Sequence, residues 1–403
     1  MAAGLALAAV WGVSALLLLR TKVPSLELPN LVPERYFPER ELERIEDFRS
    51  IRRLLWAASV GLELAVLGVI VWKASPLAAR LRRTARGRVR TGVAVALVAV
   101  VAVWVVRLPL GAVGHWWERR YGLSRQGYAG WLSDAAIGLG LRAVLVTIAV
   151  AGAVFLAARL GARWWLAGAP ALVAIAVLFV LAQPLVVQPL FNRFEPLADR
   201  RLAADVERLG RDLGVNVETV EVADASRRTT AANAYVAGIG PTRRVVFYDT
   251  ILDGRFDHGE LVSVSAHELA HVSRRHLWKG LAWFALLAAP GVYVVARVTE
   301  RRGGLRDPAL VPLGLLVALV VFLTTLPLQN AVSRRYEAEA DWLALEATRD
   351  ATSAISLDRR LVLASLGDPD PPAWAKLVLS THPPAIERIA MAEEFGRRRA
   401  ASE

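Results

Sequence analysis

Apolar residues gather in seven long runs that alternate with charged segments along the 403-residue chain. The runs cover residues 2–19, 54–72, 91–106, 143–158, 164–182, 281–296 and 309–328. A helix needs about 20 apolar residues to cross a bilayer, and several runs come close to that length. We expect the three shorter runs, at 91–106, 143–158 and 281–296, to extend past a terminal arginine that snorkels, or to pack against protein. The pattern predicts a mostly α-helical, polytopic membrane bundle of about seven spans.

Composition supports this class, because 55% of the residues are hydrophobic, more than one soluble core needs. The first run could instead be a signal peptide. However, no basic residue precedes Arg20 and no cleavage site stands out, so we favour a retained span. Cysteine is absent, which leaves any metal site to His, Glu and Asp side chains.

The net charge of +12 raises the question of a nucleic-acid partner. The Lys and Arg residues are spread over the loops between spans, so membrane lipids are the expected counter-charge and nucleic acid is not. The positive-inside comparison is a tie, with 13 basic residues flanking the spans on each side. The N-terminus before Arg20 carries no basic residue, which weakly favours an external N-terminus and a cytoplasmic catalytic side. We expect the plasma membrane as the location.

Four regions follow from the pattern. Residues 1–191 form an N-terminal membrane region with five spans, 192–280 a soluble insertion, 281–328 a two-span hairpin, and 329–403 a C-terminal tail. Because two spans separate them, the insertion and the tail must face the same side of the membrane.

The insertion is predicted to be a small α/β unit. Its expected elements are a helix at 199–213, strands at 217–222 and 244–248, and a third strand at 233–236, at an edge. Asp257 and Glu260 form a capping-box pattern at the start of a further helix.

That helix carries His267-Glu268-Leu269-Ala270-His271. Two histidines four residues apart share a helical face and can bind zinc, with Glu268 placed to act on a metal-activated water. A catalytic zinc needs a third protein ligand. His276 is the nearest candidate, but the longer motif that would use a third histidine needs Gly at 274 and His at 277. The chain has Arg274 and Leu277 there, so His276 is most simply a polar residue near the membrane surface.

A second acidic motif follows the seventh apolar run. Glu337 and Asp341 are four apart and share a helical face, whereas Glu339 points away. Glu337 is suited to bind the metal, and Asp341 to hold a ligand histidine by its other ring nitrogen. The alternative is an amphipathic helix with ordinary surface acids. Glu63, inside the second span, indicates a cavity or a partner group, or else a protonated, tolerated carboxyl group.

These motifs and several others resemble the integral-membrane CAAX prenyl protease family of zinc metallopeptidases, of the seven-span type. The matching stretches are residues 121–126 (YGLSRQ), 188–194 (QPLFNRF), 233–235 (NAY), 246–250 (VFYDT), the HExxH, 333–341, and His382-Pro383-Pro384 with Arg388-Ile389.

The resemblance implies a helical bundle that encloses a chamber, and one Zn²⁺ per chain bound by His267, His271 and Glu337, with Glu268 as general base. It further implies that Asn233 and Ala234 lie on an edge strand that pairs with the substrate backbone. His382 and Arg388 would hold the peptide and its developing oxyanion. Without the resemblance, the simpler interpretation is that His382, before two prolines, marks a loop or helix start and that Arg388 is a surface charge.

The expected function is therefore a membrane-embedded zinc metalloendopeptidase. Its substrate would be a peptide or protein, either a hydrophobic one or one with a lipidated C-terminal tail. One alternative is a quality-control protease for membrane proteins, as in the related four-span group. The other is a seven-span transporter or receptor without catalysis.

Overall fold

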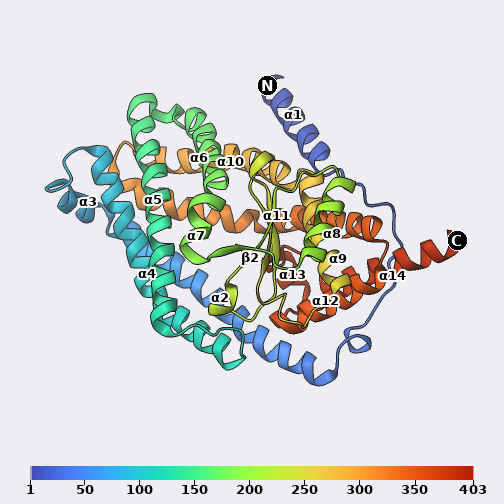
Figure 1. Ribbon diagram of the computed structural model, residues 1–403. Helices are drawn as coiled ribbons and strands as arrows, with labels where there is room; N and C mark the ends of the chain where they lie inside the picture. The colour runs from blue at the N-terminus through green and yellow to red at the C-terminus, as the bar shows by residue number, and fades with distance from the viewer. Residues whose placement is uncertain (1, 403) are drawn as a thin grey trace.

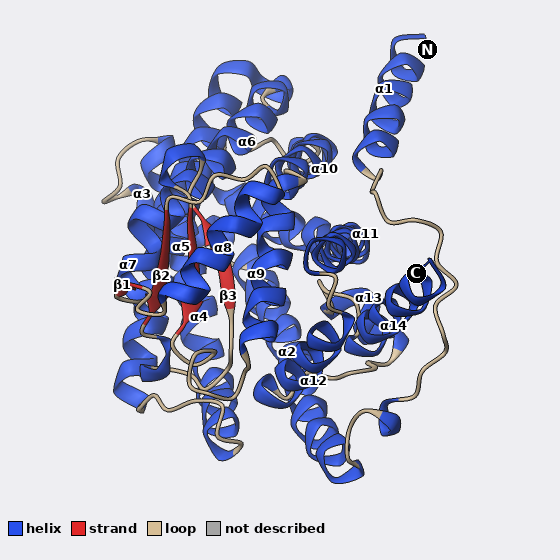
Figure 2. Cartoon of the chain, turned by 45° about the vertical axis from the view of Figure 1, so that its right-hand side comes forward, coloured by secondary structure: helices blue, strands red, loops and turns tan. Residues whose placement is uncertain are grey.

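The structure is a computed structural model that describes residues 2–402, with side-chain burial described from residue 9 onward, and it is mostly helical (Figures 1 and 2). The helices are α1 (Ala2–Leu18), α2 (Glu39–Trp72), α3 (Ala74–Arg82), α4 (Arg88–Arg120), α5 (Tyr128–Leu160), α6 (Trp165–Ala182), α7 (Gln188–Phe191), α8 (Arg200–Asp212), α9 (His258–Ser273), α10 (His276–Glu300), α11 (Val311–Thr348), α12 (Ala351–Ser365), α13 (Ala373–Leu379) and α14 (Ala385–Ser402). The strands are β1 (Phe194–Pro196), β2 (Thr219–Ala223), β3 (Ala234–Ala237) and β4 (Arg244–Tyr248). The predicted helical membrane bundle with a small α/β part is confirmed.

Among the described residues, six helices are long and apolar enough to cross a membrane: α2, α4, α5, α6 with its continuation to Phe191, α10 and α11. They contain six of the seven predicted runs. The remaining run corresponds to α1, a shorter apolar helix of 17 residues that stands beside the bundle (Figure 2). It contacts α10, where the indole nitrogen of Trp11 donates a hydrogen bond to the Leu286 carbonyl at 3.0 Å.

The helices α4 and α5 are each 33 residues long and continue past Arg107 and Arg142, as expected for the short apolar runs. Arg107 has a partner inside the bundle, because its Nη1 lies 2.5 Å from Oε2 of Glu63 on α2. The cost of a carboxylate within a span is thereby offset by an opposite charge. Glu63 is therefore one half of an ion pair between two spans.

Two of the predicted region boundaries fall inside helices. The boundary at 280/281 lies within α10, and that at 328/329 lies within α11, which continues unbroken to Thr348. The change from apolar to polar sequence marks the point where a helix leaves the membrane and not its end. As a result, Glu337 lies on the same rigid helix as the last span.

The four strands form one sheet in the order β1-β2-β4-β3. Strands β2 and β4 are parallel, while β1 and β3 pair antiparallel with their neighbours. The predicted third strand does lie at an edge. Strand β1 was not predicted, because three residues containing a proline carry no strand pattern.

The sheet packs against α8 and α9 through one apolar core. Leu202, Val206 and Leu209 on α8 are buried together with Phe247 on β4 and Leu269 on α9. The i, i+4, i+7 spacing on α8 places its three residues on one face. Both helices begin at capping aspartates, Asp199 and Asp257, the latter in the predicted capping box with Glu260. The core and the caps fix α9 against the sheet.

Candidate active site

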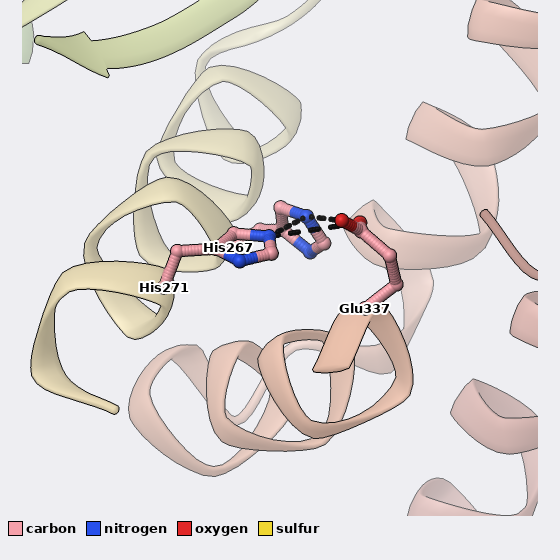
Figure 3. Close-up of side chains that lie close together, drawn as sticks. All are labelled: His267, His271 and Glu337. Carbon is pink, nitrogen blue, oxygen red and sulfur yellow. Dashed lines mark hydrogen bonds and ion pairs between the residues drawn. The ribbon is translucent and has the colours of Figure 1, made fainter. Parts of the chain in front are cut away.

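Helix α9 presents the two histidines of the HExxH motif toward α11 (Figure 3). His267 is buried and His271 half-buried, and their Nε2 atoms lie 3.0 Å apart. The carboxylate of Glu337 on α11 approaches both rings, with Oε2 at 3.3 Å from Nε2 of His267 and 3.6 Å from Nε2 of His271. Span parity predicted that the two motifs share a side of the membrane, and the structure brings them into contact.

The three side chains form a group that could hold a metal ion, with one ligand atom from each within 4.8 Å of the others. Two imidazole nitrogens and a carboxylate oxygen are a typical donor set for catalytic zinc. Tetrahedral zinc with ligands at about 2.1 Å needs donor atoms about 3.4 Å apart. The observed separations of 3.0, 3.3 and 3.6 Å bracket that value, so the residues fit such an ion.

Asp341 lies one turn beyond Glu337 on α11 and contacts the other nitrogen of the same histidine. Its Oδ1 is 2.8 Å from Nδ1 of His267. Burial opposes protonation of this imidazole, but the carboxylates of Asp341 and Glu337 outweigh it and raise the pKa of His267 to about 10. The two carboxylates around His267 therefore favour binding of a cation next to its Nε2 atom.

Arg388 on α14 lies behind Asp341. Its Nε and Nη2 donate to Oδ2 and Oδ1 of Asp341 at 2.9 and 2.6 Å, and its Nη1 lies 2.7 Å from Oδ1 of Asp358 on α12. All three guanidinium nitrogens are thus engaged by carboxylates. This placement differs from the expected contact with the peptide, because Arg388 approaches the Nδ1 side of His267 and not the Nε2 side.

Asp358 is a site residue that the sequence reasoning missed. It is buried, and burial raises the pKa of its carboxyl group to about 7, although Arg388 opposes the shift. Two acids, Asp341 and Asp358, share a single guanidinium. No local motif marks Asp358, since it lies 17 residues beyond Asp341 on a separate helix.

His276 and Glu339 have a closer relation to the site than expected. Nδ1 of His276 lies 2.9 Å from Nδ1 of His271, and its Nε2 lies 2.9 Å from Oε2 of Glu339. Glu339 does point away from Glu337, but it is fully buried and also accepts from Arg274 at 2.7 Å and Lys279 at 3.2 Å. His276, at the start of α10, is therefore buried against His271, a contact that the sequence did not predict.

Glu268 is half-buried on α9, next to the first histidine, and no residue between 2 and 402 forms a hydrogen bond with its carboxyl group. Burial raises the pKa of that carboxyl group, partly offset by the two histidines. His382 lies in the loop between α13 and α14, with its side chain 63% exposed and its Nδ1 2.7 Å from Oε2 of Glu337. Both groups are thus next to the three candidate ligands.

The edge strand β3 contacts α9 (Figure 2). Its inner edge pairs with β4, and the carbonyl of the preceding Asn233 accepts from the Tyr248 amide at 2.9 Å. Asn233 is exposed, whereas the Ala234 side chain is buried in the core. Within the described chain, no other strand covers the outer edge of β3.

A cavity of about 750 Å³ begins at His271 and Glu337 and continues between the spanning helices α6, α10 and α11. Its wall is mainly apolar, with Trp283, Phe284 and Phe322 among the lining side chains. The resemblance implied a chamber within the bundle. This cavity opens onto the candidate site at His271 and Glu337.

Comparison with known proteins agrees with the fold. Residues 196–395 match the family model of peptidase family M48, and residues 48–193 match the model described as CAAX prenyl protease N-terminal, five membrane helices. The uncharacterized metalloprotease YhfN of Bacillus subtilis (strain 168) is 28% identical over 90% of this chain and 88% of its own length. The CAAX prenyl protease 1 homolog of Oryza sativa subsp. japonica is 29% identical over 55% of this chain and 54% of its own.

Among solved structures, the crystal structure of S. mikatae Ste24p matches with a TM-score of 0.77, covering 95% of this chain and 96% of that one at 19% identity. Together, the fold and the two family models define a membrane metalloprotease. The chain belongs to peptidase family M48, in its integral-membrane CAAX prenyl protease branch.

Proposed function

We propose that the protein is a zinc-dependent metalloendopeptidase that hydrolyses peptide bonds at a membrane-embedded site. The observation that carries this proposal is the approach of Glu337 on α11 to His267 and His271 on α9, at donor separations that fit tetrahedral zinc. One Zn²⁺ per chain would be held by these three side chains.

When bound, zinc would lower the pKa of water and polarise the peptide carbonyl group. Glu268 takes the proton from the attacking water and later passes it to the leaving amine. Its half-buried position and raised pKa suit this role, because a carboxylate with a higher pKa is a stronger base toward the attacking water. His382, exposed beside Glu337, is positioned to stabilise negative charge that develops on the carbonyl oxygen.

The substrate backbone would pair with the outer edge of β3, near Asn233 and Ala234. Main-chain pairing at a sheet edge holds many different sequences in one register, which suits a protease. We assign Arg388 a positioning role, since it holds Asp341, which in turn contacts His267.

The cavity between α6, α10 and α11 favours an apolar substrate segment, either a hydrophobic peptide or a lipidated C-terminal tail. The names of relatives called CAAX prenyl protease support the lipidated tail. Gly280 lines this cavity, and a Cβ added there meets nothing within 4 Å. Gly280→Leu should therefore lower kcat/KM more for a lipidated peptide than for the same peptide without lipid. The control is Gly138→Leu on α5, whose Cβ is equally unobstructed.

The alternative functions are less well supported. A protein of the four-span quality-control group is not expected to match a family model with five membrane helices. A transporter or receptor is not expected to match a peptidase family model.

We further infer a plasma-membrane location with the catalytic side in the cytoplasm. Adding a protease to sealed right-side-out vesicles tests this orientation. The loop at 121–127 should stay intact, and its cleavage from outside would mean that the catalytic side faces outward.

The decisive experiment compares Glu268→Gln with the wild type in purified protein. The variant should keep one zinc per chain by elemental analysis but lose at least about a hundredfold in peptide turnover. A second variant, His267→Ala with Glu337→Ala, should lose the metal. Wild-type turnover by Glu268→Gln would disprove the mechanism, and the absence of zinc from carefully prepared wild type would disprove the metal assignment.

A further inference from the structure

A second cavity, of about 810 Å³, lies between the α3–α4 turn and the α10–α11 turn. Figure 1 shows α3 at the outer end of the bundle, away from the sheet. Arg82, Arg86, Arg88 and Arg306 line the cavity, and Asp307 is its one acidic lining residue in the described part of the chain. The cavity is therefore strongly basic.

Most of this charge is not neutralised by the protein. Arg82 pairs with Asp307 at 2.7 Å, and Arg306 donates from its Nε to the Gly303 carbonyl. Across residues 2–402, the guanidinium groups of Arg86 and Arg88 have neither an ion pair nor a hydrogen bond. Residues 73–90 contain seven Lys or Arg and no Asp or Glu. The exposed guanidinium groups of Arg86 and Arg88 are therefore available to an external anion.

The basic turn is also well anchored. On α3, Ala78 is buried and Leu81 partly buried against the bundle. The Thr91 hydroxyl donates to the carbonyls of Ala85 and Gly87, at 3.1 and 2.9 Å. The arginines thus extend from a packed turn around a formed cavity and not from a flexible tail.

The cavity lies beside the ends of two membrane-spanning helices. Two spans meet at this turn, because α2 ends at Trp72 and α4 begins at Arg88. Trp72 is 75% exposed, and Nζ of Lys73 lies 3.6 Å from the centre of its ring. An exposed tryptophan beside a lysine at a span end is typical of the membrane interface.

We propose that this cavity binds the phosphate-containing headgroup of an anionic phospholipid. Guanidinium groups match phosphate geometry with paired hydrogen bonds, and Arg86 and Arg88 are available to make them. Free phosphate has the same chemistry, but the position at the span ends favours the lipid as the source. The 121–127 loop pairs with the soluble insertion and so marks the catalytic side of the membrane. The basic cavity lies on the opposite side. This proposal is therefore independent of the proposed peptidase function.

Native mass spectrometry of the detergent-solubilised full chain tests the proposal, with phosphatidylglycerol, phosphatidylcholine or inorganic phosphate added. We expect tighter binding of phosphatidylglycerol than of phosphatidylcholine. Arg86→Gln with Arg88→Gln should weaken phosphatidylglycerol binding about tenfold or more, given the attraction of each basic residue to anionic lipid.

The matched control is Arg301→Gln with Arg302→Gln, which removes the same charge from exposed arginines that do not line the cavity. This variant should bind phosphatidylglycerol as the wild type does. Equal losses in the two double variants would mean diffuse surface attraction and overturn the site. Equal binding of the two lipids, or equally tight binding of inorganic phosphate, would overturn the anionic lipid as its ligand.

Discussion

Nδ1 of His267 and Oδ1 of Asp341 lie 2.8 Å apart and join helix α9 to helix α11. The same imidazole faces Glu337 with its other nitrogen. One histidine is thus held between two carboxylates of a single helix that are four residues apart, which fixes both the orientation and the tautomer of the ring.

Replacing Asp341 with asparagine should weaken zinc binding about ten- to a hundredfold, because the contact that orients His267 loses its charge. The measurement is zinc affinity by competition with a chelator. Glu346→Gln is the control, since Glu346 lies on the same helix and, among the described residues, its carboxylate accepts a hydrogen bond only from the Trp342 indole. Unchanged affinity in Asp341→Asn would show that the contact does not tune the metal.

His276→Ala should also lower zinc affinity, by about tenfold or more, although His276 is not a proposed ligand. The change leaves Nδ1 of His271 without its partner and removes a partner of the buried Glu339. His276→Gln retains an acceptor and a donor, so it should recover part of the affinity. If both variants lose the same affinity, packing and not hydrogen bonding is what His276 contributes.

Arg388→Ala should destabilise the protein by about 3–5 kcal/mol, since it leaves the buried carboxylate of Asp341 without its cation and removes the partner of Asp358. Arg397→Ala, whose side chain is exposed on the same helix, should cost no more than about 1 kcal/mol. Thermal unfolding in detergent measures both. A wild-type Tm for Arg388→Ala, with a raised KM, would instead place Arg388 on the substrate.

Asp358 should make stability depend on pH. Burial raises its pKa to about 7 in the folded protein, above the unfolded value of about 3.9. Between these values, the folded state holds a proton that the unfolded state has released, so the Asp358 contribution to stability falls as pH rises from about 4 to about 7. Asp358→Asn should flatten this part of the Tm–pH profile. Parallel profiles for wild type and variant would contradict the assignment.

His382→Ala should lower kcat about a hundredfold while zinc content stays at the wild-type level, as expected for a group that stabilises developing charge. The control is Thr381→Ala, because Thr381 is the exposed neighbour of His382. This variant should retain activity. Loss of zinc in His382→Ala would mean that its contact with Glu337 supports the metal instead.

The candidate ligands could be predicted because each motif is local. His267 and His271 share a helical face by their spacing, as do Glu337 and Asp341, and span parity relates the two pairs. The partners of Arg388 and His276 could not be predicted in this way. Arg388 meets Asp341 across 47 residues and three loops. His276 meets His271 only because the chain turns between α9 and α10 at Arg275, which is in the left-handed conformation.

By itself, the sequence determined the membrane class, the helical periods, the edge strand, the capped HExxH helix and the shared side of its two motifs. These follow from hydrophobic pattern and residue spacing, which act over a few turns of chain. Only the tertiary structure decided that α11 continues from the membrane to Glu337, that Asp358 shares Arg388, and that four arginines surround one cavity. Such relations depend on how distant helices pack, because side chains from separate elements meet only after the bundle has formed.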